Sequence, residues 1–270
     1  MASPVSYSGG LNLTGTVFQN GPDLLQLEDC YLSGAVQWLD TISGNDANAG
    51  SEPELPVATL SQAVTNSAAS GVIVIGEGST LTIAVAQTIS LAGLRIVGCG
   101  SGSTRPRLTC SGTVSMLDVT AAGVRIHNLY FPASTAAATN RIAFTGINGE
   151  VRDCYFECGA SDTNRAVRIH TAAHGVRVRD SQFVSTASRP AVGLEISAAV
   201  TDPSVENCIF DGGSFGWSDF AFKISAAATR INIEDVELNN RSDFKATVTA
   251  TSYQAFGLSV DGLNRVEWTA

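Results

Sequence analysis

A short pattern of apolar, polar and turn-forming residues recurs along this chain. Its copies read RIHNLYF, EVRDCYF, RVRDSQF, SVENCIF and NIEDVEL, starting at positions 125, 150, 177, 204 and 232. In each copy, apolar and polar residues alternate on both sides of an Asn or Asp, which predicts two short strands joined by a corner. Asn and Asp suit such corners because they tolerate the left-handed backbone conformation.

The repeat has a nearly constant length and contains a further strand. The corner residues are Asn128, Asp153, Asp180, Asn207 and Asp235, so successive corners lie 25, 27, 27 and 28 positions apart. An earlier copy, RIVGCGS from position 95, places Gly98 in the same column. Another alternating block precedes each copy, reading MLDVT, RIAFT, AVRIH, GLEIS and AFKIS.

A fixed period of this length, with strands and no helix signal, predicts a solenoid. The pattern of leucine-rich repeats is missing, and propeller blades need about forty residues. The sequence therefore predicts an all-β fold: a single-stranded, right-handed parallel β-helix of about seven coils over residues 72–270.

The alternation also predicts which side chains form the core. Residues in one column of successive coils stack at about 4.8 Å, the spacing of neighbouring strands. The predicted inward columns are Ile126, Val151, Val178, Val205 and Ile233, then Leu129, Cys154, Ser181, Cys208 and Val236, then Phe131, Phe156, Phe183, Phe210 and Leu238.

These repeats resemble those of the pectate-lyase-like superfamily. The preceding segment, WLDTISGNDANAGSEPELPVATLSQAV at 38–64, is similar to the start of β-helices in bacteriophage virion proteins and secreted bacterial enzymes. Thr59 and Gln62 have the spacing of a capping box, which predicts a short helix closing the open end of the coil stack within residues 38–71. Residues 1–37 lack the repeat and are either extra cap strands or an attachment arm.

Composition narrows the function. The formal net charge is −9. Nucleic-acid binding favours a basic surface, so we expect no nucleic-acid partner. No apolar run approaches 18 residues, so we expect no membrane span. The N-terminus lacks the pattern of a secretory signal, so we expect a protein made in the cytoplasm and retained there or in an assembly. No cofactor motif is present, and the six cysteines lack the spacing of a zinc site.

Two pairs of cysteines have different expected environments. Cys154 and Cys208 share an inward column but lie two coils apart, beyond the reach of a disulfide. Cys30 and Cys158 lie outside the predicted core pattern, which makes them candidates for cross-links.

The resemblance implies enzyme signatures that this chain does not carry intact. Of the polygalacturonase motifs, only Arg168-Ile169-His170 approaches the RIK element. The aspartates that could bind calcium in a pectate lyase occupy corners, where turn formation explains them. Glu206 and Glu234 would lie one coil apart in an outward column, near the separation of a retaining glycosidase pair. Any two carboxylates of one column share that spacing, so solvated surface charge is the alternative.

Three further groups of polar residues are candidate sites. The first is an arginine-rich cluster around Glu150, suited to an anionic partner or simply exposed to solvent: Arg125, His127, Arg152, Arg177 and Arg179. The second is a possible calcium site in the segment before the coils, for which turn formation is the alternative: Asp40, Asp46, Asn48 and Glu52. The third is a column of alternating charge, Arg168, Glu195 and Lys223, which favours the coil register without a ligand.

Two functions fit these features. The first is a non-enzymatic structural protein of a bacteriophage virion, such as a capsid decoration or a tail or fibre component. It would be a homotrimer, assembled in the host cytoplasm and bound to capsid or tail subunits. The alternative is a carbohydrate-binding or polysaccharide-degrading β-helix, including a tailspike-type depolymerase of the polysaccharide lyase or glycoside hydrolase class, acting on a host surface glycan.

Overall fold

The computed structural model describes residues 35–133, 138–159, 165–170, 172–186, 192–197, 199–225, 228–240, 242–247, 253–260 and 266–269. These residues belong to one compact unit, Leu32–Ala270. The predicted attachment arm or extra cap strands, except for its last residues, and Cys30 lie outside the described residues. No helix in the described ranges is long and apolar enough to cross a membrane.

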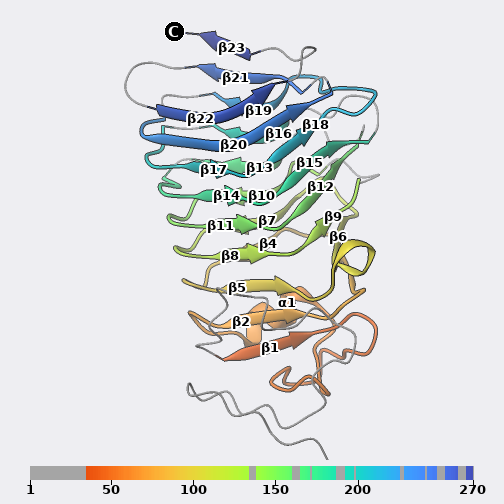
Figure 1. Cartoon of the computed structure of the whole chain (residues 1–270). Helices are drawn as coiled ribbons and strands as arrows, with labels where there is room; N and C mark the ends of the chain where they lie inside the picture. Colours follow the sequence, from red (N-terminus) through yellow and green to blue (C-terminus); the bar gives the residue numbers. More distant parts are fainter. Residues whose placement is uncertain are drawn as a thin grey trace, which may run out of the picture. The chain divides into compact units, whose positions relative to one another are not determined.

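A typical coil consists of three strands, which we call the first, second and third limbs (Figure 1). The first limb comprises β1 (Val36–Leu39), β2 (Val72–Ile75), β5 (Arg95–Gly98), β8 (Arg125–His127), β11 (Glu150–Arg152), β14 (Arg177–Arg179) and β17 (Ser204–Glu206). The second comprises β3 (Thr80–Ile83), β6 (Arg107–Cys110), β9 (Tyr130–Phe131), β12 (Tyr155–Cys158), β15 (Gln182–Ser185) and β18 (Ile209–Asp211). The third comprises β4 (Gln87–Ile89), β7 (Ser115–Val119), β10 (Asn140–Phe144), β13 (Arg165–Ile169), β16 (Val192–Ile196), β19 (Phe220–Ile224), β21 (Phe244–Thr247) and β23 (Val266–Thr269).

The predicted parallel β-helix is confirmed, because strands of one limb pair in parallel from coil to coil. Six coils, from β2-β3-β4 to β17-β18-β19, have three separate strands. Above them, β20 (Ile231–Asn239) and β22 (Tyr253–Val260) each span the first and second limbs as one continuous strand. The predicted number of about seven coils is therefore close.

The corner between the first and second limbs has the predicted left-handed backbone. Asn128, Asp153, Asp180, Asn207 and Asp235 have φ angles of 55°, 53°, 52°, 47° and 49°. The earlier copy differs, because Gly98 ends β5 and the left-handed residue is Gly100, at φ 87°. A Cβ atom on Gly98 would lie 2.3 Å from the Asn128 carbonyl oxygen, so the close approach of the next coil explains this glycine.

A second column of left-handed residues lies between the third limb and the first limb of the next coil. Its residues are Gly93, Gly123, Asn148, Gly175, Asp202 and Arg230. The N–H groups of the first five donate to carbonyl oxygens of the coil above, as Asn148 does to His174 at 2.7 Å. The sequence repeats did not predict this corner.

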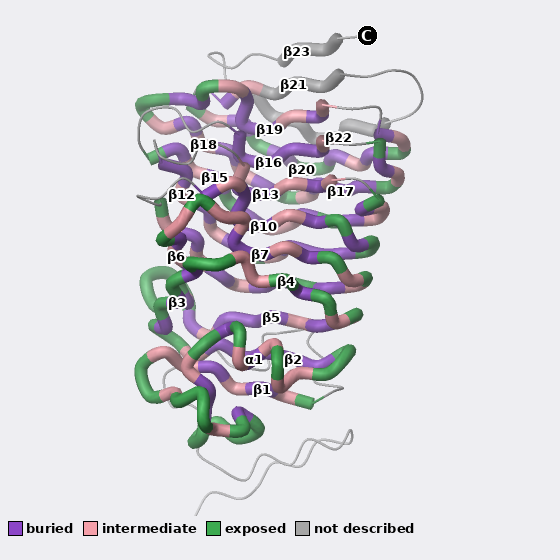
Figure 2. Tube along the Cα trace, turned by 180° about the vertical axis from the view of Figure 1, so that it is seen from behind, coloured by how far each residue is buried: buried purple, intermediate pink, exposed green. Residues whose placement is uncertain are grey.

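The predicted inward columns form the core. The rings of Phe131, Phe156, Phe183 and Phe210 stack with centroids 4.6–4.8 Å apart and interplanar angles of 6–11°. All members of the other two columns are buried as well. Figure 2 shows buried residues along the strands and exposed residues mainly in the turns and loops.

More cysteines are buried in this core than the sequence predicts. Cys154 and Cys208 are buried, and burial raises the pKa of each thiol to about 12. Cys158 was predicted to lie outside the core, but it is only 2% exposed. The reason is that alternation continues along β12, which sends Phe156 and Cys158 to the same inward side.

The segment before the coils packs against the first coil and covers that end of the stack. β1 pairs with β2 from Val36 onward, two residues before the predicted boundary. The predicted helix is α1 (Leu60–Asn66), which contacts β1 and β4 and buries Leu60 and Ala63. It occupies the place of a third-limb strand, so apolar side chains cover the interior at this end.

Only half of the predicted capping box forms. Thr59 Oγ1 accepts a hydrogen bond from the Gln62 N–H at 3.2 Å, as predicted. The Thr59 N–H, however, donates to Asp46 Oδ1 at 2.9 Å, and Gln62 Nε2 instead donates to Asn66 Oδ1 at 2.8 Å. A carboxylate from the preceding loop is the stronger acceptor for this N–H, so Gln62 takes another partner.

The Phe183→Ala substitution tests the stacked core. The cavity left in mid-stack should lower the free energy of unfolding by about 3–5 kcal/mol. Urea titration followed by circular dichroism would measure it. Val184→Ala on the same strand is the control, because Val184 is only partly buried. Equal destabilisation by the two substitutions would contradict the stacked-core interpretation.

Candidate functional site

Two adjoining hollows lie beside the corner between the first and second limbs. One, of about 420 Å³, is lined by Arg152, Asp153, Asp180, Gln182, Asn207 and Ile209, among others. The other, of about 480 Å³, also contains Asp153, Asp180 and Gln182 and adds Arg105, Arg107, Tyr130 and Tyr155. Because they share three residues, we treat them as one corner groove.

The coil register explains why these residues gather. The corner column supplies Asp153, Asp180 and Asn207. Two residues after each corner, the alternation sends a side chain outward. The strand pairings align these outward residues as Arg107, Tyr130, Tyr155, Gln182 and Ile209. The corner groove therefore runs from coil to coil.

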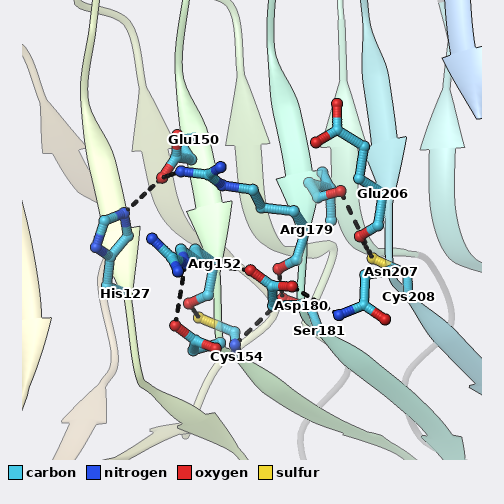
Figure 3. Close-up of polar contacts among 12 residues, drawn as sticks. His127, Glu150, Arg152, Cys154, Arg179, Asp180, Ser181, Glu206, Asn207 and Cys208 are labelled. Atoms are coloured by element: carbon cyan, nitrogen blue, oxygen red, sulfur yellow. Dashed lines mark hydrogen bonds and ion pairs between the residues drawn. The ribbon is translucent and has the colours of Figure 1, made fainter. Parts of the chain in front are cut away.

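Arg152 joins two carboxylates in the corner groove (Figure 3). Its Nε lies 3.3 Å from Asp153 Oδ2 and 3.1 Å from Asp180 Oδ2. Asn207 Nδ2 donates to Asp180 Oδ1 at 2.8 Å. Burial and the charge of Asp180 raise the pKa of Asp153 above its usual value, although Arg152 acts in the opposite direction. The two aspartates thus occupy different electrostatic environments.

Two tyrosines form one side of the groove. The rings of Tyr130 and Tyr155 meet edge to face, with centroids 5.5 Å apart, and both side chains are half-buried. The Arg107 guanidinium carbon lies 5.1 Å from the Tyr130 ring centroid. Burial and a hydrogen bond with Glu157 raise the pKa of Tyr130 to about 12, so this phenol stays protonated at neutral pH.

The predicted arginine-rich cluster is largely neutralised by carboxylates of the same chain. His127 Nε2 lies 2.9 Å from Glu150 Oε1, and Arg179 Nη2 lies 3.3 Å from the same oxygen (Figure 3). His127 and Glu150 are buried, unlike the exposed column that the sequence predicts, whereas Arg125 and Arg177 are exposed. With Arg152 directed to the aspartates, the five residues do not form one binding surface.

The electrostatics of Glu150 follow from these contacts. Burial tends to raise the pKa of Glu150, but the hydrogen bond from His127 and the charges of His127, Arg179 and Arg125 outweigh it. The pKa falls to about 2, from an ordinary value of 4.5. Glu150 is therefore a buried carboxylate that stays ionised.

The predicted glutamate pair lies outside the corner groove. Glu206 and Glu234 occupy neighbouring strands in the predicted register. Glu206 Oε1 accepts a hydrogen bond from Ser204 and is 3.4 Å from Asn232 Nδ2, and Glu234 is exposed. Neither side chain lines either hollow.

The calcium candidates form turns and caps. Asp40 accepts hydrogen bonds from Ile42, Ser43 and Ser79. Asp46 accepts three from residues 58 and 59. Asn48 Nδ2 donates to the Pro56 carbonyl, and Glu52 is exposed. Within the described ranges, no three His, Cys, Asp or Glu side chains gather as a metal site would require.

The alternating column on the third limb forms as predicted. Arg168, Glu195 and Lys223 are in register on β13, β16 and β19. Glu195 is buried and accepts hydrogen bonds from Ser225, at 2.7 Å, and from Arg165, which the sequence did not single out. Burial acts to raise the pKa of Glu195, but these bonds and nearby cations lower it below its ordinary value.

The sequence also did not single out the groove residues Arg105, Arg107, Tyr130, Tyr155 and Gln182. Four of them share one outward column, so alternation along the second limb carried the signal. Arg105 follows the irregular turn that replaces the corner in the earlier coil, and no repeat pattern marks it.

No protein-family model and no curated protein sequence matches this chain. Among solved structures, the pectate lyase Pel9A aligns with a TM-score of 0.54 and 12% identity, over 87% of this chain and 76% of the enzyme. A rhamnogalacturonan lyase gives 0.46 and 14%, over 88% and 63%. An alginate lyase from Paenibacillus sp. strain FPU-7 gives 0.39 and 11%, over 86% and 99%.

At these identities the likeness concerns the fold alone, and only the first TM-score exceeds 0.5. None of the three proteins is named as a bacteriophage protein, so they give the predicted virion origin no support. The chain has the parallel β-helix fold of pectate-lyase-like proteins.

The Glu150→Gln substitution tests the buried ion pairs. The pKa of Glu150 in the folded protein, about 2, lies below its ordinary value of 4.5. Ionisation of Glu150 therefore stabilises the fold above pH 4.5, and this stabilisation is lost as pH falls towards 2. Between pH 5 and 3 the wild type should lose about 2 kcal/mol more unfolding free energy than the variant. Urea titrations at each pH would measure this. Glu234→Gln, a substitution at an exposed position, should show the same pH dependence of the unfolding free energy as the wild type. If all three proteins lose the same unfolding free energy between pH 5 and 3, the lowered pKa of Glu150 is refuted.

Proposed function

We propose that this protein binds a polysaccharide along the corner groove. The observation that carries the proposal is the pair of tyrosine rings beside a row of carboxylate, guanidinium and amide groups. Sugar rings have apolar faces that pack on aromatic rings, and hydroxyl edges that hydrogen-bond to such polar groups. Binding sites commonly combine these two features in a concave surface.

The repetition of the coils suits a repeating ligand. The outward column and the corner column each present one side chain per coil, about 4.8 Å apart. A glycan lying along the groove would therefore meet new polar partners at each coil. The pectate lyase with the same fold acts on a polysaccharide by its name, but the likeness reaches only the fold, so the proposal rests on the groove.

Asp153 and Asp180 are the groove residues suited to cleavage. Asp180 contacts Arg152 and Asn207, whereas burial and the charge of Asp180 raise the pKa of Asp153. Two carboxylates with different environments can act as base and acid in glycoside hydrolysis. Assaying new reducing ends would reveal hydrolysis, and new unsaturated ends would reveal a lyase.

The bacteriophage role stays a prediction from the segment at 38–64. The trimer, the capsid or tail partners and the virion location stay predictions with it. Copurification of the protein with phage particles, in a fixed copy number, would support them. This role is compatible with the groove, because a particle-bound β-helix could present a glycan-binding surface.

The Tyr130→Ala and Tyr155→Ala substitutions test glycan binding. Each should weaken retention on a panel of immobilised polysaccharides about tenfold, since stacking and burial on one ring are lost. Phe215→Ala is the matched control, because Phe215 is an exposed aromatic residue outside the groove. If the wild type retains no polysaccharide, or if the tyrosine variants bind as well as the control, the proposal fails.

A further inference from the structure

We propose that the C-terminal end of the coil stack is an interface at which two copies of this chain pair tail to tail, as a closed dimer. The inference goes beyond glycan binding and does not involve the corner groove. It starts from β22 and β23, which lie at this end (Figure 1). Among the described residues, β22 pairs only with β20 and β23 pairs only with β21. The outer edges of both strands therefore have no strand partner in the part of the chain that the structure describes.

The opposite end of the stack is closed by the chain itself. On the outer side of β1, the Trp38 N–H donates to the Gly50 carbonyl at 2.6 Å. The Asp40 N–H similarly donates to the Val57 carbonyl at 2.9 Å. Helix α1 takes the place of a third-limb strand at this end. A second copy cannot extend the first and third limbs there, so head-to-tail stacking into an open filament is blocked, whereas a tail-to-tail contact is not.

The backbone of β22 places hydrogen-bonding groups along its outer edge. In the first limb, the column that contains Ser204 and Asn232 donates to the coil below, as Asn232 does to the Pro203 carbonyl at 3.0 Å. Gln254 occupies this column in β22. Successive N–H groups of a strand point to opposite edges, so the N–H of Ala255 faces away from β20. Such an edge is a template for pairing with another strand.

The sequence of β22 lacks the features that protect strand edges. Protected edges are short or carry charged side chains or proline. β22 is eight residues long, reads YQAFGLSV and contains neither a charge nor a proline. Its positions in register with the inward columns hold apolar residues, so a second copy at this end would extend the apolar core. These residues are Ala255, Leu258 and Val260, which pair with Ile233, Val236 and Leu238.

Antiparallel pairing fits the symmetry of two identical copies. Gly257 lies between the residues paired with Glu234 and Val236, and thus opposite the left-handed corner residue Asp235. A two-fold axis through this corner, perpendicular to the stack, places the first-limb half of one β22 on the second-limb half of the other, with opposite strand directions. In the same dimer the two β23 strands face each other antiparallel. Both copies use the same surface, so association closes at two.

Sedimentation velocity of the full-length protein at micromolar concentration tests this interface. The wild type should sediment as a dimer, with about twice the 28.0 kDa mass of one chain. Ala255→Pro should raise the dimer dissociation constant about tenfold or more, because each copy loses an outward N–H while the ladder to β20 is kept. Circular dichroism would check that the variant keeps its strands.

Thr82→Pro is the matched control, because it changes another edge strand at the opposite end of the stack. Thr82 is exposed and lies two residues after Thr80, whose N–H donates to Thr41 Oγ1 on the outer edge of β3. Thr82→Pro should stay dimeric like the wild type. Equal weakening of the dimer by the two prolines would overturn the tail-to-tail interface.

Gly257→Cys provides a measurement that does not depend on weakening the dimer. Opposite residues of antiparallel strands have Cα atoms about 4.5–5.5 Å apart, which is within disulfide reach. Mild oxidation should give a covalent dimer on a non-reducing gel. The wild type, with its own six cysteines, and Thr82→Cys should not give one. A monomeric wild type, a trimer that Ala255→Pro leaves intact, or equal cross-linking of Gly257→Cys and Thr82→Cys would overturn the proposal.

Discussion

The left-handed corner between the first and second limbs is the constraint on which the rest of the structure depends. It requires a residue that tolerates positive φ, and Asn or Asp provides it in five successive coils. The corner also resets the alternation: the next residue points inward, the one after it outward, and the third inward again. One backbone requirement thereby fixes both the phenylalanine stack and the outward column of the groove.

The side chain at the corner contributes more than its backbone tolerance. Glycine would satisfy the φ angle, but Asp180 also accepts hydrogen bonds from Arg152 and Asn207 of neighbouring coils. Asn128 similarly donates to the carbonyls of Gly98 and Gly100 at 2.7 and 2.8 Å. These contacts bind each coil to the next outside the β-sheet ladder. Three of these polar residues, Arg152, Asp180 and Asn207, also line the corner groove.

The sequence was sufficient to predict features that repeat once per coil. The corners, the inward columns and the charge-alternating column were predicted because the same residue type returns at a fixed spacing. The second corner was missed because glycine, asparagine, aspartate and arginine alternate there with no common type. The capping role of Asp46 was missed because its partner is 13 residues away. Tyr130 and Tyr155 share an outward column that alternation along the second limb could have indicated, whereas Arg105 follows an irregular turn and no repeat pattern places it beside them.

The arginines of this fold differ in whether a carboxylate of a neighbouring coil pairs with them. Only two of the sixteen basic residues of the whole chain are lysines, Lys223 and Lys245. Several arginines reach across one coil to an acid, as Arg152 does to Asp180 and Arg230 to Asp202. Such pairs hold the register and leave little charge for a ligand. Arg125 and Arg177 stand on an open sheet face, where water can solvate them. Arg105 and Arg107 instead line the corner groove, where the Arg107 guanidinium packs over the Tyr130 ring.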